Sequence, residues 1–308
     1  MKRAMKIPAP TSIPPSLPQR EDATHKGQVG RVVIIAGSRG MSGAACLAAA
    51  GALRGGAGLV RVLTPESVQP LVASSDPCLM SVPMPETKAG QFDPIKCGEL
   101  LEDSFAWATV AAIGPGIGQH RSLEKFVCFA LDKFTGPLVV DADGLNNLAS
   151  AGEDVWKLRD GKPTVITPHP GEMARLRESA ELATLNGQDD ETRLCCAHEY
   201  AAKAKITVVL KGYRTVVAAP DQTYVNTTGN PGMATGGMGD VLTGLIAALL
   251  GQGLSAFDAA CLGVYTHGLA GDLCAKSIGP IGFLARDVAE ILPAALARVV
   301  NQSMGFKP

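Results

Sequence analysis

A glycine-rich loop followed by an apolar helix is the part of this sequence best suited to chemistry. The run Gly236-Gly-Met-Gly-Asp240 carries one carboxylate, and the apolar stretch 241–250 follows directly. Because glycines have no side chains, their backbone N–H groups can come close to an anion. The first turn of a helix adds unpaired N–H donors and the positive end of the helix dipole. The sequence therefore predicts an anion hole for phosphate, formed by Gly236, Gly237, Met238 and Gly239.

Asp240 is the residue to which we assign the chemistry. A carboxylate next to bound phosphate is unfavourable unless it acts, for example by taking a proton from a hydroxyl that attacks a phosphoryl group. The simpler alternative is that Asp240 only caps the helix. The number of flanking glycines favours the catalytic role.

Composition excludes several classes of protein. The chain has 308 residues, of which 46% are hydrophobic, 19% charged and 5% aromatic, with a net charge of −1. These values allow a large core and give no support for a nucleic-acid or membrane-surface partner. The eight cysteines include no Cys-x-x-Cys pair, so we expect free thiols and no zinc site. The N-terminus lacks an apolar signal core, so we expect a cytoplasmic protein.

Apolar runs typical of buried strands alternate with helical patterns along most of the chain. Such alternation predicts an α/β fold, with a mostly parallel central sheet and helices on both faces. Later segments predict two short antiparallel strands and three helices. The predicted strands are 31–36, 59–63, 109–113, 137–141, 164–167, 206–210, 215–219 and 223–225, and the predicted helices include 44–56, 240–250, 256–274 and 283–298. We expect one domain over residues 29–300, a proline-rich N-terminal arm over 1–28 and a C-terminal tail over 301–308.

Polar or glycine-rich loops follow five of these strands. Ligands of open α/β sheets bind beyond the carboxyl ends of the strands, so we expect the loops to converge with the Asp240 loop on one rim. The glycines between 37 and 43 have neither the spacing of a dinucleotide-binding fingerprint nor a Walker lysine. The five loops are 37–43, 114–118, 141–146, 167–172 and 211–215.

Within these loops, several polar residues permit more than one interpretation. His169 stands between two prolines, which favours contact with a substrate over a purely structural role. Glu172 either stabilises a helix N-terminus or holds a metal-bound water. Asp141 and Asp143 either position magnesium, which prefers oxygen ligands, or cap the next helix. The segment 211–215 is either a phosphate or ribose contact or a plain hairpin turn.

Taken together, these motifs resemble the NAD(P)H-hydrate dehydratase family, which has a ribokinase-like fold. The similarity covers about residues 27–298, and its most specific part is the segment from Asn230 to Gly244. The motifs occur in the same order along the chain, namely 37–45, 54–60, 114–116, 167–172, 211–215 and 230–240.

The resemblance implies an enzyme that repairs NADH or NADPH hydrated at ring carbon 6, using ADP or ATP with Mg²⁺. The ring hydroxyl would be phosphorylated and phosphate then eliminated, with Asp240 as the catalytic base. The implied substrate contacts are Ala44, Gly116, His169 and Asp240, and the implied nucleotide contacts are Lys211, Gly212, Tyr213, Arg214, Thr215 and Gly239.

Family members are often fused to an epimerase domain. This chain has no room for one, so we expect a separate epimerase acting on the same hydrates, and we expect a homo-oligomer. Ribokinase-like kinases often carry Asn-x-x-Glu where this chain has His169-Pro-Gly-Glu172, which favours a dehydratase. The alternatives are a kinase of a small hydroxymethyl vitamin precursor and a non-enzymatic nucleotide sensor.

Overall fold

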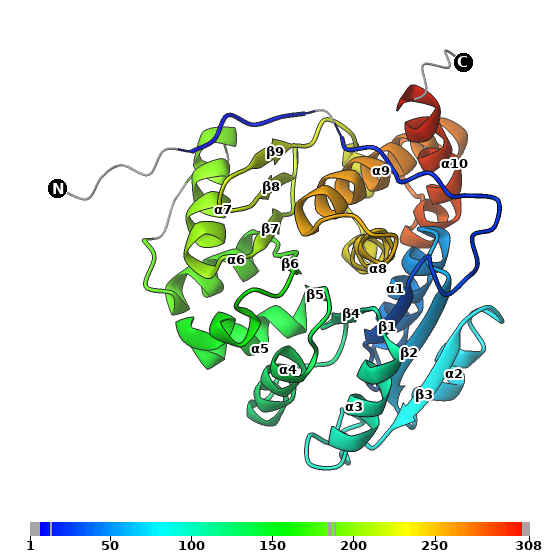
Figure 1. Ribbon diagram of the computed structural model, residues 1–308, viewed down its shortest axis with the longest axis vertical. Helices are drawn as coiled ribbons and strands as arrows, with labels where there is room; N and C mark the ends of the chain where they lie inside the picture. Colours follow the sequence, from blue (N-terminus) through cyan, green and yellow to red (C-terminus); the bar gives the residue numbers. More distant parts are fainter. Residues whose placement is uncertain (1–6, 13, 184–186, 188, 304–308) are drawn as a thin grey trace.

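A nine-stranded sheet organises the molecule, which we describe from a computed structural model for residues 7–12, 14–183, 187 and 189–303 (Figure 1). The strand order is β3-β2-β1-β4-β5-β6-β7-β8-β9. The first seven strands are parallel, and β8 and β9 add an antiparallel edge. The strands are β1 (Arg31–Ile35), β2 (Leu59–Pro65), β3 (Met80–Met84), β4 (Val110–Ile113), β5 (Leu138–Val140), β6 (Thr164–Ile166), β7 (Thr207–Leu210), β8 (Val216–Ala218) and β9 (Thr223–Val225).

Helices cover both faces of the sheet. One face carries α1 (Ser42–Arg54), α2 (Gln69–Ala73), α8 (Met238–Gly251), α9 (Ala256–Ser277) and α10 (Ala285–Ser303). The other carries α3 (Gly98–Trp107), α4 (Arg121–Lys133), α5 (Asp143–Ala151), α6 (Pro170–Ser179) and α7 (Asp190–Ala204). Two 3₁₀ helices, η1 (Glu153–Arg159) and η2 (Pro231–Met233), complete the described elements.

The continuous apolar strands are explained by this double cover. In β1, Val32 and Ile34 belong to the core under α1 and α8, whereas Val33 and Ile35 belong to the core under α3 and α4. Successive side chains of a strand point to opposite faces, so both sets must be apolar. The expected α/β fold, with a mostly parallel sheet and helices on both faces, is confirmed.

One strand was not predicted from the sequence. β3 pairs in parallel with β2 at the edge of the sheet, and its sequence Met-Ser-Val-Pro-Met contains Pro83. Proline cannot donate to a strand ladder and is confined to edge strands or bulges, so its presence weakened the strand pattern. The segment is also only partly buried, so its side chains do not form a continuous apolar run.

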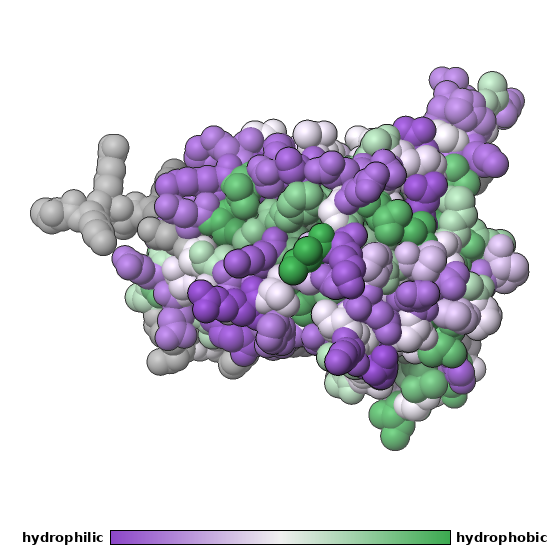
Figure 2. Space-filling model, turned by 90° about the horizontal axis from the view of Figure 1, so that it is seen from below, coloured by the Kyte–Doolittle hydropathy of each residue, from purple (hydrophilic) through white to green (hydrophobic). Residues whose placement is uncertain are grey.

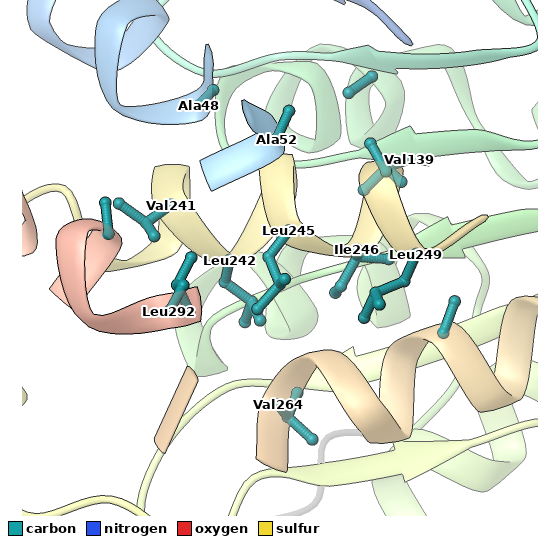
Figure 3. Packing of buried hydrophobic residues seen from close by; sticks show 14 of the residues in the cluster. Ala48, Ala52, Val139, Val241, Leu242, Leu245, Ile246, Leu249, Val264 and Leu292 are labelled. Atoms are coloured by element: carbon teal, nitrogen blue, oxygen red, sulfur yellow. The ribbon is translucent and has the colours of Figure 1, made fainter. Parts of the chain in front are cut away.

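Helix α8 carries the predicted chemistry at its N-terminus and packs closely against α1 (Figure 3). An added methyl group at Gly244 would lie 1.9 Å from the Ala48 carbonyl oxygen, and one at Gly51 would lie 2.2 Å from that of Val241. Only glycine permits such a close helix crossing. This crossing fixes the direction of α8 and therefore the place of its first turn.

The described part of the proline-rich arm runs along the antiparallel edge. Thr11 donates its backbone N–H to Thr223 O at 3.1 Å and accepts from Val225 N at 2.9 Å. Farther along, the Arg20 guanidinium donates to Gly56 O at 2.6 Å. The arm therefore covers one sheet edge and reaches the end of α1. In the described part of the chain, no helix has the length and apolarity needed to cross a bilayer.

Candidate active site

The carboxyl ends of the parallel strands meet at one rim, and the predicted loops lie along it. Two of them contact each other directly: Ser38 Oγ donates to Gly116 O at 2.7 Å, and Gly37 N donates to Pro115 O at 2.8 Å. An added methyl group at Gly116, whose φ is +64°, would lie 3.0 Å from the Ala44 side chain. The structure thus brings together Ala44 and Gly116, two of the implied substrate contacts.

Asp240 lies in the first turn of α8. The N-cap of this helix is Gly237, whose φ of +89° is left-handed, and its start has no side-chain cap. Asp240 is therefore the third helical residue and not the N-cap, so the simple capping alternative is wrong. The first backbone N–H groups of an uncapped helix are available to an anion. This geometry agrees with the predicted anion hole at residues 236–239.

The electrostatic surroundings of Asp240 suit a base that works near neutral pH. Its partial burial, together with the negative charges of Asp141 and Asp143, raises its pKa to about 7, although Lys211 acts in the opposite direction. Desolvation disfavours a charged carboxylate, and a like charge nearby disfavours it further. A general base is most effective when its pKa lies near the operating pH.

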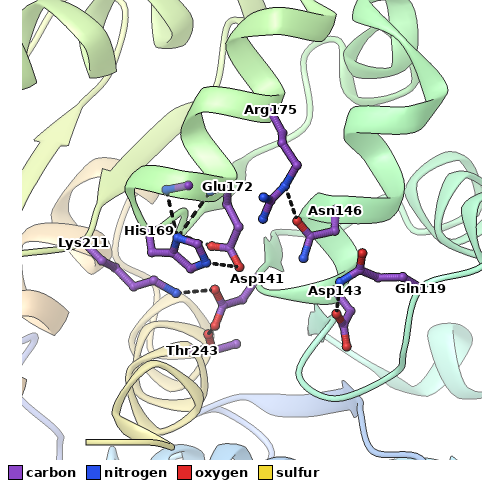
Figure 4. A network of polar contacts seen from close by, with 10 residues as sticks. Gln119, Asp141, Asp143, Asn146, His169, Glu172, Arg175, Lys211 and Thr243 are labelled. Atoms are coloured by element: carbon purple, nitrogen blue, oxygen red, sulfur yellow. Dashed lines mark hydrogen bonds and ion pairs between the residues drawn. The ribbon is translucent and has the colours of Figure 1, made fainter. Parts of the chain in front are cut away.

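Asp141 lies at the centre of a buried polar cluster, in which it contacts Lys211 and Thr243 (Figure 4). Its Oδ1 accepts from Lys211 Nζ at 2.7 Å, and its Oδ2 accepts from Thr243 Oγ1 at 2.7 Å. The structure does not support the alternative in which Asp141 caps α5, since the N-cap of that helix is Ala142 and has no side-chain cap bond. Asp141 instead connects the end of β5 to Lys211 after β7 and to α8.

Lys211 is the cation of this cluster. Burial disfavours its ammonium form, but the charges of Asp141, Glu172 and Asp240 outweigh this effect and raise its pKa. The ammonium group lies close to Gly239, because an added methyl group there would be 3.2 Å from Nζ. Lys211 is therefore protonated and lies beside the anion hole.

His169 and Glu172 form a capping box at the start of α6 (Figure 4). His169 Nδ1 accepts from the amides of Gly171 and Glu172, and Glu172 Oε2 accepts from His169 N at 2.8 Å. His169 Nε2 lies 3.3 Å from Glu172 Oε1. Both residues therefore have the structural role that the sequence left open. The His169 side chain is still 51% exposed, so its ring remains accessible to a ligand.

The loop 211–215 is the turn between β7 and β8. Tyr213 is 87% exposed, Arg214 pairs with Asp190 at 2.9 Å, and Thr215 Oγ1 donates to Gly212 O. Only Lys211 of this segment points to the Asp141 cluster. The hairpin-turn interpretation is correct for the backbone, and it leaves the predicted nucleotide contact open.

Two buried residues that the sequence did not single out support the rim. The Arg193 guanidinium donates to the carbonyl groups of Leu210, Tyr213 and Arg214, and so fixes the turn. His267 of α9 lies behind the anion hole with a hydrogen bond to the backbone of Met238, and burial lowers its pKa to about 4. Arg193 lies within a helical pattern of mixed polarity and His267 within a mostly apolar one, and no motif in the sequence marks either residue.

Two surface hollows lie elsewhere. One of about 570 Å³ is lined by Trp156, Tyr200 and neighbouring lysines, and one of about 220 Å³ is lined by Phe105 and Phe134. Neither contains a residue of the cluster or the glycine loop.

A parallel sheet with its ligand groups at the strand ends, and with a glycine-preceded helix carrying one carboxylate, is the arrangement of a ribokinase-like α/β protein. Ribokinase from Thermotoga maritima has this fold, with a TM-score of 0.52 at 14% identity over 86% of this chain and 99% of its own. Residues 32–294 match the family model of NAD(P)H-hydrate dehydratase. The chain belongs to this family.

Several relatives are similar over most of this chain. The bifunctional NAD(P)H-hydrate repair enzyme Nnr of Moorella thermoacetica is 46% identical over 93% of this chain and 53% of its own length. The ADP-dependent (S)-NAD(P)H-hydrate dehydratase of Neisseria meningitidis serogroup B is 37% identical over 92% and 90%. The ADP/ATP-dependent NAD(P)H-hydrate dehydratase of Bacillus subtilis, co-crystallised with ATP/Mg²⁺, has a TM-score of 0.74 at 29% identity, covering 92% and 95%. The chain spans about half the length of the bifunctional relatives.

Proposed function

We propose that this chain dehydrates the 6-hydroxy forms of NADH and NADPH back to the dihydropyridines, at the expense of ADP or ATP. The observation that carries the proposal is the first turn of α8, where a carboxylate with a pKa of about 7 stands next to an uncapped helix start. This arrangement supplies a base for a hydroxyl and donors for a phosphoryl group at the same place. The names of the relatives supply the substrate class.

The steps follow from the chemistry of the hydrate. A ring hydroxyl is a poor leaving group at neutral pH. Asp240 accepts its proton while the hydroxyl oxygen bonds to the terminal phosphorus and the bond to the nucleotide's bridging oxygen breaks. The lone pair of the ring nitrogen then expels phosphate, and loss of a proton from the adjacent ring carbon restores the double bond. No oxidation or reduction takes place.

Each side of the rim has its own task in this proposal. Ala44, Gly116 and the exposed ring of His169 contact the hydrated nicotinamide nucleotide. Residues 211–215 and Gly239 contact the adenine nucleotide. The amides of residues 236–239 stabilise the charge of the phosphoryl group in transit.

Magnesium fits the site as a companion of the nucleotide. Among the described residues, no group of three or more His, Cys, Asp or Glu side chains could hold an ion. Mg²⁺ commonly keeps several waters and binds substrate phosphates with few protein ligands, so a preformed cage is not required. Glu172 would hold one of its waters, and the ion would supply charge neutralisation for the phosphates.

Kinase chemistry is the second candidate, because the same base and anion hole could phosphorylate a stable hydroxyl. The relatives hydroxyethylthiazole kinase and ribokinase share the fold but are only 15% and 14% identical to this chain.

The separate epimerase, the homo-oligomer and the cytoplasmic location stay predictions.

Incubation of NADH hydrate with the protein and ADP or ATP tests the function. A dehydratase restores the absorbance of NADH and releases one inorganic phosphate for each nucleotide consumed. A kinase instead accumulates a stable phosphate ester with no gain in absorbance. A nucleotide sensor binds the nucleotide but neither restores the absorbance of NADH nor transfers or releases phosphate.

A further inference from the structure

We infer that Asp141 and Thr243 are positioning residues that hold the Lys211 ammonium against Gly239, so that Lys211 stabilises the phosphoryl group in transit. The inference rests on the proposed function. It assigns a task to two residues that touch neither the hydrate nor the nucleotide in the proposed roles. It also assigns Lys211 to the phosphoryl group in transit, and not only to the bound nucleotide in general.

The geometry of the Asp141–Lys211 pair places the ammonium group at the rim. The Lys211 side chain is 20% exposed, whereas that of Asp141 is 1% exposed, so the pair has its carboxylate inside and its ammonium towards the rim. Thr243 is fully buried and donates to the second carboxylate oxygen, which fixes the plane of the carboxylate. A lysine stem is flexible and ordinarily samples many rotamers, so a buried two-point anchor is required to hold its charge in one place.

Gly239 lies next to the Lys211 ammonium group. An added methyl group there would lie 3.2 Å from Lys211 Nζ and 3.6 Å from Asp141 Oδ2. The ammonium therefore occupies the space next to an amide of the predicted anion hole. A fixed positive charge beside backbone donors is the arrangement that stabilises a transferring phosphoryl group.

The charges that act on Asp240 come from several elements. The charged groups around Asp240 are Asp141 after β5, Asp143 of α5 and Lys211 after β7, and Glu172 of α6 acts on Lys211. His267 of α9 is uncharged at neutral pH because burial lowers its pKa. Asp141 and Lys211 therefore act on Asp240 with opposite signs. Neutralising either one must shift the pH dependence in a predictable direction.

A double-mutant cycle with Asp141→Asn and Lys211→Met tests the inference, using turnover of NADH hydrate with ADP. We expect Lys211→Met to lower kcat by about 10²-fold, the size of loss typical for one preorganised donor. The double variant should lose no more than about twofold beyond Lys211→Met alone, because Asp141 acts through the missing ammonium. Losses that multiply would contradict the inference.

Below a certain pH, kcat/KM falls as the pH falls, and we call this part of the pH profile the acidic limb. A purely structural role of Asp141 and Lys211 would not shift the pH at which this limb lies. Asp141→Asn should move the limb to lower pH, and Lys211→Met should move it to higher pH. Thr243→Val should lower kcat by about 2–10-fold without moving the limb, since it removes one hydrogen bond and no charge. Limbs that stay in place in both charge variants would overturn the inference.

The exposed pair of Lys205 and Asp160, at 3.4 Å, gives a matched control. Lys205→Met and Asp160→Asn should leave both kcat and the limb unchanged. If the wild-type protein does not turn over the hydrate, the proposed function fails. In that case, the ADP affinities of the same variants are compared by calorimetry. Additive changes in the binding free energy would contradict the positioning role, independently of the proposed function.

Discussion

The glycine loop before α8 and the polar cluster of Asp141, Glu172 and Lys211 meet at the same rim, yet different forces fix them. The loop gains its position from α8, which crosses α1 where Gly51 and Gly244 leave no room for a side chain. In the cluster, Asp141 after β5 bonds to Lys211 after β7 and to Thr243 of α8. Glu172 pairs with His169 in the cap of α6 and acts on Lys211 through its charge. We therefore expect the loop to respond to added volume and the cluster to respond to charge and pH.

Figure 2 shows a face of the molecule that is mostly hydrophilic, with hydrophobic residues in small groups.

The largest expected effect belongs to Asp240, where the two regions meet. Asp240→Asn keeps the size and most hydrogen bonds of the side chain but removes the base, so kcat should fall by about 10²–10⁴-fold. Steady-state turnover of NADH hydrate measures this loss, and calorimetry should find ADP binding retained. Asp258→Asn is the matched control, because Asp258 is likewise a first-turn acid of an apolar helix. Near-normal turnover of the Asp240 variant would mean that the base lies elsewhere.

Added volume at the crossing should cost stability. Gly244→Ala introduces a methyl group 1.9 Å from the Ala48 carbonyl oxygen, so α1 and α8 must separate. Overpacking of this kind costs about 1–3 kcal/mol or more of the free energy of unfolding. Urea denaturation measures the change. Gly43→Ala in α1 is the control, since its methyl group would meet nothing within 4 Å and alanine is the better helix former. Equal stability of the two variants would refute the close crossing.

The smallest expected effect concerns His169. His169→Ala should raise the KM for NADH hydrate about fivefold while changing the KM for ADP little, in proportion to the loss of roughly one hydrogen bond. His169→Asn separates the two roles of this side chain, because asparagine can still cap α6 but has no imidazole ring. An Asn variant with a normal KM would show that capping is the only role.

The sequence reveals what depends on local patterns and hides what depends on distant contacts. Apolar runs predicted the buried strands, and the glycines before Asp240 predicted the helix start. The edge strand β3 was missed because Pro83 and partial exposure mask its pattern. The role of Asp141 stayed open between magnesium and capping, since its partners Lys211 and Thr243 lie 70 and 102 residues away along the chain.

Arg193 was missed for the same reason. Its carbonyl partners lie 17 to 21 residues further along the chain, and its own helix carries several other charged residues. Only the fold brings the turn after β7 over this guanidinium. Buried arginines that bind backbone carbonyls leave no motif in the sequence.

The pH dependence of kcat/KM for NADH hydrate tests the central claim, that Asp240 is the base, most directly. Burial and the charge of Asp141 raise the pKa of Asp240 to about 7, and a base works only when it is deprotonated. Activity should therefore rise tenfold per pH unit below about pH 7 and level off above it. The residual activity of Asp240→Asn should lack this limb. A limb near pH 4 in the wild type, or an unchanged limb in the Asn variant, would contradict the assignment.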